Sequence, residues 1–213
     1  MNQRFNIIAP LGGFGNHVRW LILLDSSFTF NLQDNIVLNN ITQKIDFIKD
    51  FVYSADRTWH NWLQFEWRYR EDLDTHIQFG HSLVEIGHPD KQTLILKTNP
   101  DLAYKSYLKF NSNLNNRPRS RFTDDVNQIN NLNVEGDNFL LLNSDMVYQP
   151  TLNRDLYTTL INFFELDDLY NEANFIHTLW YKGQQRSEYE FVKDITELYG
   201  PTVAFKQNTI RFG

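Results

Sequence analysis

The sequence contains no cysteine, which excludes disulfides, thiolate chemistry and metal sites built from cysteine. Basic residues are also scarce: 20 Lys and Arg stand against 26 Asp and Glu, for a formal net charge of −6. A broad nucleic-acid interface needs a basic surface that neutralises phosphates, so we expect no nucleic-acid partner. No run reaches the roughly 18 apolar residues of a membrane span, and residues 1–9 lack the layout of a signal peptide. We therefore expect no membrane association and a cytoplasmic protein.

The chain has enough apolar residues for a sizeable core, because 41% of its 213 residues are hydrophobic and 15% are aromatic. Its length suits one domain, and we expect residues 1–213 to form it. The segment 111–137 is polar and rich in asparagine, which predicts a long surface loop and makes it the best candidate for an insertion. Its arginines, Arg117, Arg119 and Arg121, would either close over a ligand or remain solvated.

Short apolar runs alternate with helical patterns along the chain. The runs predict strands at 4–9, 75–82, 92–100 and 138–146. The patterns between and after them predict helices at 16–28, 40–56, 101–111 and 151–166, with one or two more in 168–200. This alternation is typical of an α/β fold with three layers, in which helices flank a mostly parallel sheet.

Three of the nine glycines, Gly12, Gly13 and Gly15, fall within four positions between the first predicted strand and helix. Such a turn aims backbone N–H groups inward at a helix N-terminus, where an anion can bind. We therefore expect Gly12, Gly13, Gly15, Asn16 and His17 to hold a phosphate-bearing ligand. A tight turn without a ligand would have the same sequence. The loop is not that of a nucleotide triphosphatase, because no lysine follows Gly15.

The stretch "LKTNPDLAYKSYLKF" resembles the segment R-N-P-x-D-x-x-x-S-x-x-x-F of P-loop sulfotransferases, with Asn99, Pro100, Ser106 and Phe110 at the family spacing. The stretch "FLLLNSDM" and the helix after it resemble the family's strand, acidic turn and helix. The resemblance implies a P-loop nucleotide-hydrolase-like fold of the sulfotransferase type. It also implies transfer of a sulfuryl group from 3′-phosphoadenosine 5′-phosphosulfate to a hydroxyl on a small molecule or carbohydrate.

The same resemblance assigns roles to single residues. The glycine loop takes the place of the loop that holds the 5′-phosphosulfate, and Ser106, with Lys97 or Thr98, would hold the 3′-phosphate. Two positions differ from the family pattern, because Leu11 and Thr98 stand where the family has basic residues. His17 and Arg19, in the first turns of the predicted helix, would replace the missing loop cation.

Sulfuryl transfer also needs a base that removes the proton of the acceptor hydroxyl. His81 closes the second predicted strand and is our first candidate; His17 is a further catalytic candidate, and His76 and His88 are reserves. Each of these histidines could instead have an ordinary structural role. We expect no metal, because no ligand spacing such as H-E-x-x-H occurs. The sequence leaves the acceptor and the oligomeric state open.

Other interpretations of the glycine loop remain open. The stretch "GGFGNH" is similar to the G-G-L-G-N-Q opening of one family of fucosyltransferases, which use a GDP-sugar. That family also needs an H-x-R-R-x-D motif, which the chain lacks. A nucleotide-binding protein of the sulfotransferase kind without catalysis, or another phosphate-handling P-loop protein, would carry the same features.

Overall fold

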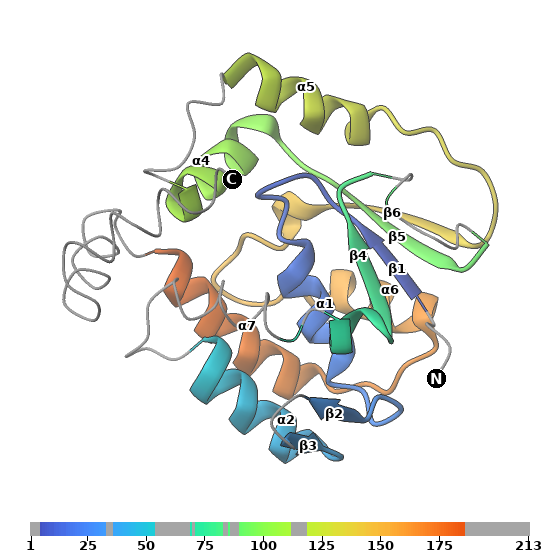
Figure 1. Cartoon of the computed structure of the whole chain (residues 1–213), viewed down its shortest axis with the longest axis vertical. Helices are drawn as coiled ribbons and strands as arrows, with labels where there is room; N and C mark the ends of the chain where they lie inside the picture. The colour runs from blue at the N-terminus through green and yellow to red at the C-terminus, as the bar shows by residue number, and fades with distance from the viewer. Residues whose placement is uncertain are drawn as a thin grey trace.

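The computed structural model describes residues 5–32, 36–53, 69, 71–82, 85, 90–111 and 119–185. Four parallel strands form its main sheet, in the order β4-β1-β5-β6 (Figure 1). The predicted strands are confirmed, each shorter than its apolar run: β1 is Phe5–Ile8, β4 is Ile77–Gly80, β5 is Gln92–Lys97 and β6 is Phe139–Asn143. The chain therefore has the predicted α/β architecture around a parallel sheet.

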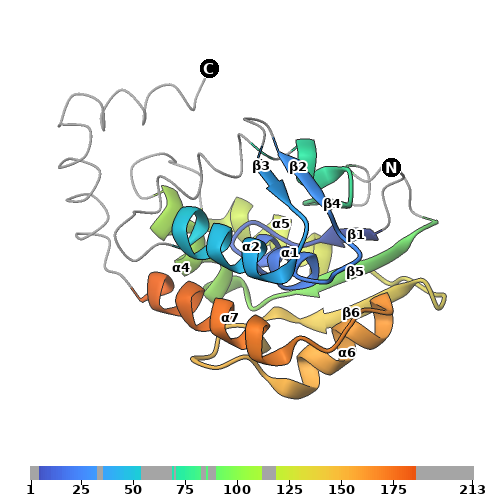
Figure 2. The same cartoon turned by 90° about the horizontal axis from the view of Figure 1, so that it is seen from below.

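Helices cover both faces of this sheet (Figures 1 and 2). One layer contains α1 (Gly15–Leu23), α6 (Arg154–Phe164) and α7 (Tyr170–Gln184), and the other contains α4 (Pro100–Asn111) and α5 (Arg119–Asn130). Side chains that alternate along a strand point to opposite faces. Accordingly, Leu94 and Leu96 belong to the large core shared with α1, α6 and α7, whereas Ile95 packs with Ile129 of α5.

A small antiparallel pair, which the sequence analysis did not predict, follows α1. It consists of β2 (Phe30–Leu32) and β3 (Ile36–Leu38). The helix predicted over 40–56 begins as α2 (Ile41–Phe47), with the side chain of Asn40 as its cap, and continues as a π-helical segment, η2 (Ile48–Val52). In Figure 2 α2 runs beside α7, and η2 contacts α7.

The prediction of a loop over 111–137 is wrong for much of that segment, because α5 occupies Arg119–Asn130. The apolar residues of α5 are spaced as on one helical face: Phe122 and Val126 pack on Ala103 of α4, and Ile129 packs on the sheet. The many polar residues between them hid this spacing in the sequence. Arg119 begins the helix, and Arg117 lies outside the described residues.

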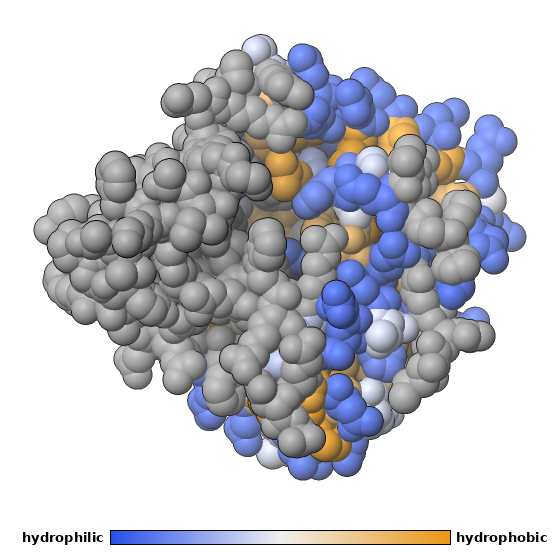
Figure 3. All heavy atoms as spheres, in the orientation of Figure 1, coloured by the Kyte–Doolittle hydropathy of each residue, from blue (hydrophilic) through white to orange (hydrophobic). Residues whose placement is uncertain are grey.

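The helix starts also differ in one case. The structure begins α1 at Gly15, after Phe14 in the left-handed conformation (φ 63°), and Asn16 is not its cap. Asn153 caps α6, because its side chain accepts a hydrogen bond from the Leu156 backbone. On the face in Figure 3, hydrophilic residues surround small hydrophobic areas. None of the helices in the described ranges has the length and apolar character needed to cross a membrane.

Candidate functional site

The strand order places two predicted ligand-binding segments side by side. From β1 the chain goes to β4 on one side, and β5 then lies on the other side of β1. Ligands in open α/β sheets bind at the carboxyl ends of strands where the order reverses in this way. Here that crevice lies between the glycine loop, which follows β1, and the turn at Thr98, which follows β5. We define these two segments, with His81 at the end of β4, as the candidate site.

The glycines of the loop are needed for close packing. Gly12 has φ +75°, and a Cβ atom on it would lie 2.1 Å from the Ala103 carbonyl oxygen in α4. A Cβ on Gly13 would lie 2.8 Å from the Pro10 ring, and a Cβ on Gly15 would lie 2.2 Å from the Phe79 ring. Packing alone therefore accounts for all three glycines, and the loop contacts α4 directly.

The N-terminus of α1 has the electrostatic character that the sequence predicted. No side chain caps it, and its first turn carries no acidic residue. The first N–H groups of a helix lack intrahelical acceptors and carry partial positive charge. This end of α1, with the half-buried Asn16 in its first turn, can therefore accept an anion.

His81 lies where the sequence analysis expected it, beside the loop. Its Nδ1 is 2.8 Å from the Ala9 carbonyl oxygen, and its backbone N–H donates to a Glu85 carboxylate oxygen at 2.7 Å. Because a carbonyl oxygen only accepts, Nδ1 carries the hydrogen, and Nε2 of the neutral ring keeps its lone pair. No described residue bonds to Nε2. The ring is thus in the form that can accept a proton.

His17 points away from the predicted ligand. It is 1% exposed and stacks on Trp180 of α7 at 4.0 Å between ring centroids. Its Nδ1 is 3.1 Å from the Tyr53 hydroxyl oxygen, and its Nε2 is 3.0 Å from Nδ1 of His177. Burial first, and then the neighbouring His177, lowers the pKa of His17 well below 6.5. Both ring nitrogens are engaged inside the protein because position 17 lies on the face of α1 that packs on α7.

Arg19 is also directed inward, at 4% exposure, with Nη2 2.9 Å from a carboxylate oxygen of Asp74. The cations that we expected to replace the missing basic residue of the loop therefore have partners elsewhere.

His76, a reserve base, is 5% exposed, and its Nε2 is 3.1 Å from the Thr29 carbonyl oxygen. His88 lies outside the described residues.

Lys97 is the basic residue that ends β5. It is half-buried, and no described residue forms an ion pair with it. Strand alternation puts its side chain on the same side as Ile95, toward the α4–α5 layer. Of the two residues predicted to help Ser106 hold a 3′-phosphate, Lys97 therefore lies on the layer that contains α4.

Two hydroxyls near this turn are buried, and the described part of the chain offers neither of them a hydrogen-bond partner. Thr98 Oγ1 and Ser106 Oγ, each in a residue 3% exposed, make no hydrogen bond to a described residue. Buried polar groups are nearly always paired, so each of these hydroxyls can form a hydrogen bond with a group that approaches it. Ser106 lies three residues after Ala103, which puts it on the side of α4 that packs on α5 and near the glycine loop.

Side chains that the sequence analysis did not single out hold the turn after β5. Asn130 of α5 accepts from the Thr98 N–H at 3.0 Å and donates to the Thr98 carbonyl at 2.8 Å. Asp145, after β6, accepts from the Asn99 N–H at 3.1 Å. Asp145 lies in the acidic turn that resembles the sulfotransferase segment, whereas nothing in the sequence distinguishes Asn130 from the other asparagines.

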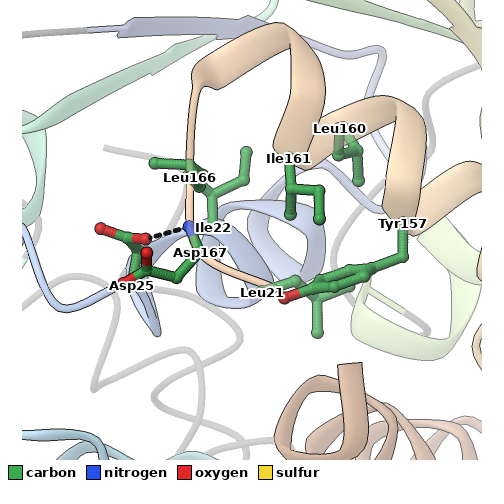
Figure 4. Close-up of a pocket in the computed structure, with 8 residues that line it drawn as sticks. All are labelled: Leu21, Ile22, Asp25, Tyr157, Leu160, Ile161, Leu166 and Asp167. Atoms are coloured by element: carbon green, nitrogen blue, oxygen red, sulfur yellow. Dashed lines mark hydrogen bonds between the residues drawn. The ribbon is translucent and has the colours of Figure 1, made fainter. Parts of the chain in front are cut away.

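A small pocket lies away from this site, between α1 and α6 (Figure 4). Its volume is about 10 Å³, which is close to the least that one water molecule needs. The Asp25 carboxylate at its rim accepts from the Asp167 N–H at 2.7 Å. The lining is otherwise mostly apolar, and comprises Leu21, Ile22, Asp25, Tyr157, Leu160, Ile161, Leu166 and Asp167. This pocket is too small for a nucleotide or an acceptor.

No family model, curated protein or solved structure matches the chain. Over the described ranges, no three His, Asp or Glu side chains gather into a group that could hold a metal ion. Site roles therefore depend on the geometry above and on the residue patterns of the sequence.

Proposed function

We propose that the chain is a transferase of the P-loop sulfotransferase kind, which moves a sulfuryl group from 3′-phosphoadenosine 5′-phosphosulfate to a hydroxyl acceptor. One observation carries the proposal. The glycine loop and the N-P-x-x-x-x-x-S segment, which the sequence pairs only through the sulfotransferase resemblance, contact each other through Gly12 and Ala103 at the point where the strand order reverses. A candidate base, His81, ends the neighbouring strand.

The residues present suit parts of this donor. The uncapped end of α1 would receive the 5′-phosphosulfate, and the buried Ser106 hydroxyl, with Lys97 on the same layer, would receive the 3′-phosphate. Positive charge is limited, because His17 and Arg19 have partners inside the protein. We therefore expect Lys97 to contribute more to donor binding than a single lysine would in a site that has several basic residues.

In the reaction, Nε2 of His81 would take the proton of the acceptor hydroxyl. The acceptor oxygen then forms a bond to sulfur as the bond between sulfur and the bridging phosphate oxygen breaks. The electrons of that bond go to the leaving 3′,5′-bisphosphate, whose charge the N–H groups at the start of α1 would stabilise. Atoms and charge balance with no metal and no redox partner.

Thermal unfolding with a ligand panel tests this proposal. The panel contains 3′-phosphoadenosine 5′-phosphate, ADP, GDP, GDP-fucose and sulfate, because a ligand that binds only the folded state raises Tm. We expect 3′-phosphoadenosine 5′-phosphate to raise Tm more than ADP, and the increase to be lost in Ser106→Ala and Lys97→Met. Thr151→Ala, which removes an exposed hydroxyl in another part of the chain, is the matched control.

Three outcomes would contradict the proposal. Stabilisation by GDP or GDP-fucose alone would support sugar transfer, and no response to any nucleotide would exclude a nucleotide-dependent enzyme. Binding of 3′-phosphoadenosine 5′-phosphate without transfer of labelled sulfate to any hydroxyl in an acceptor panel would support the non-catalytic alternative.

A further inference from the structure

The carboxyl ends of β1 and β4 are joined by two hydrogen bonds through one residue. The Ala9 N–H donates to the Gly80 carbonyl at 3.2 Å, and the Ala9 carbonyl accepts from Nδ1 of His81 at 2.8 Å. Ala9 is followed directly by Pro10 and the glycine loop. The ring of His81 is therefore attached to the strand end from which the loop begins, and the position of one depends on the other.

Glu85 holds the other side of His81. Its carboxylate accepts from the His81 backbone N–H at 2.7 Å, as a charged acceptor that strengthens the bond. Its own backbone carbonyl accepts from Nε2 of Gln78 at 2.8 Å, which anchors Glu85 to β4. A Cβ on Gly80 would lie 3.1 Å from the Glu85 Cβ, so the glycine leaves room for this side chain.

These contacts determine where the ring of His81 points. The backbone at residue 81 is held by Glu85, the ring lies edge-on to Phe79 with 5.0 Å between centroids, and Nδ1 is taken by Ala9. A histidine free to rotate in water exchanges its hydrogen between Nδ1 and Nε2, and only the form with hydrogen on Nδ1 can accept a proton at Nε2.

We propose that Glu85 is a positioning residue which, with the Ala9 carbonyl, holds His81 in the Nδ1–H tautomer and presents Nε2 as the proton acceptor. The inference rests on the proposed function for the identity of the base. It adds a residue that acts through His81.

Nuclear magnetic resonance of the ¹⁵N-histidine-labelled full chain tests the inference without any substrate. The His81 signals are assigned by their loss in His81→Gln. In the unmodified protein we expect Nδ1 to have the ¹⁵N shift of a protonated nitrogen and Nε2 that of an unprotonated one. Glu85→Ala should give the averaged shifts of a ring that exchanges between tautomers. Glu85→Gln should restore the original pattern, because its amide oxygen can still accept from the backbone.

The control is Glu135→Ala, which removes an exposed carboxylate far along the chain and should leave the His81 signals unchanged. If Glu85→Ala loses its amide dispersion and does not fold, Glu85→Asp, one methylene shorter, provides the same comparison. An Nε2–H tautomer in the unmodified protein, or unchanged shifts in the folded Glu85 variant, would overturn the inference.

The two proposals fail separately. A protein with the expected tautomer that binds no nucleotide loses the proposed function, while the arrangement around His81 stands. A protein that is stabilised by 3′-phosphoadenosine 5′-phosphate but has hydrogen on Nε2 of His81 keeps the donor site and loses the role of Glu85.

Discussion

Nε2 of His17 and Nδ1 of His177 lie 3.0 Å apart in the core, where they join α1 to α7. Nε2 of His177 is 2.8 Å from the Gln149 carbonyl oxygen, which can only accept, so His177 donates there and accepts at Nδ1. His17 then donates from Nε2 and accepts at Nδ1 from the Tyr53 hydroxyl. Hydrogen bonds run in one direction through all four groups, and this arrangement requires both imidazoles to be neutral.

Stability is therefore expected to fall as the pH is lowered. Burial lowers the pKa of both histidines below 6.5, so below that pH the unfolded chain binds protons that the folded chain does not. The stability is fully present above pH 6.5 and is lost as the pH falls toward the folded pKa values. The slope is at most about 1.4 kcal/mol per pH unit for each histidine. Urea unfolding between pH 7.5 and 5 measures it.

The matched variants identify the groups responsible for this slope. His177→Gln can keep a donor and an acceptor without titrating, and it should make the slope shallower. His81→Gln, which changes a half-buried histidine outside the pair, should not. An equal slope in all three proteins would show that the pair does not control the acid response.

Tyr53→Phe should destabilise the protein, because Nδ1 of the buried His17 would lose its donor. An unpaired buried acceptor costs about 1–3 kcal/mol. The free energy of unfolding in urea measures the loss. Tyr181→Phe is the control, because this half-buried ring packs on Tyr148 and no described residue bonds to its hydroxyl. Equal stabilities of the two variants would contradict a stabilising hydrogen bond between the Tyr53 hydroxyl and His17.

The sequence predicted the sheet better than the site. The four strands of the main sheet are short apolar runs next to proline, glycine or polar turns, and such runs can be recognised locally. The hairpin of β2 and β3 was missed because strands of three residues carry too little pattern. The direction of His17 depends on Trp180 and His177, which lie some 160 positions away, and no local pattern could reveal it.

Gly12→Ala should lower Tm and weaken any ligand response at the loop. A Cβ at residue 12 would be 2.1 Å from the Ala103 carbonyl oxygen, and alanine disfavours the φ of +75°. Gly183→Ala is the control, because a Cβ there meets nothing within 4 Å and alanine is the better helix former, by about 1 kcal/mol. We expect Gly183→Ala to raise Tm. A Gly12→Ala protein with unchanged Tm would contradict the contact between the loop and α4.

Asn130→Asp should disturb the turn after β5. An aspartate keeps the acceptor for the Thr98 N–H but loses the donor to the Thr98 carbonyl and faces it with a carboxylate oxygen. We expect a loss of about 1–3 kcal/mol in urea unfolding. Asn127→Asp, exposed on the same helix, adds the same charge near the same helix end and should have a smaller effect. Equal effects would mean that helix electrostatics, and not the clamp on Thr98, causes the loss.

Lys44 predicts a second rise of stability with pH, on the alkaline side. Its side chain is 2% exposed, and its ammonium donates to the carbonyls of Leu24 and Asp25 at the end of α1. Burial, opposed by the Asp25 carboxylate, lowers the pKa of Lys44 from 10.5 to about 8. Between these values the unfolded chain keeps a proton that the folded chain releases, so stability should rise with pH across this window.

The rise should be measured by urea unfolding between pH 8 and 9.5. Burial raises the pKa of Tyr157 from 10.0 to about 12, which favours the unfolded state only above pH 10, outside this interval. Lys44→Met keeps much of the side-chain volume without the titrating group and should abolish the rise. Lys49→Met, at a lysine whose side chain is 46% exposed, should retain it. If the stability of Lys44→Met rises with pH as steeply as that of the unmodified protein, another group is releasing the proton. Lys44 then remains charged in the folded state throughout.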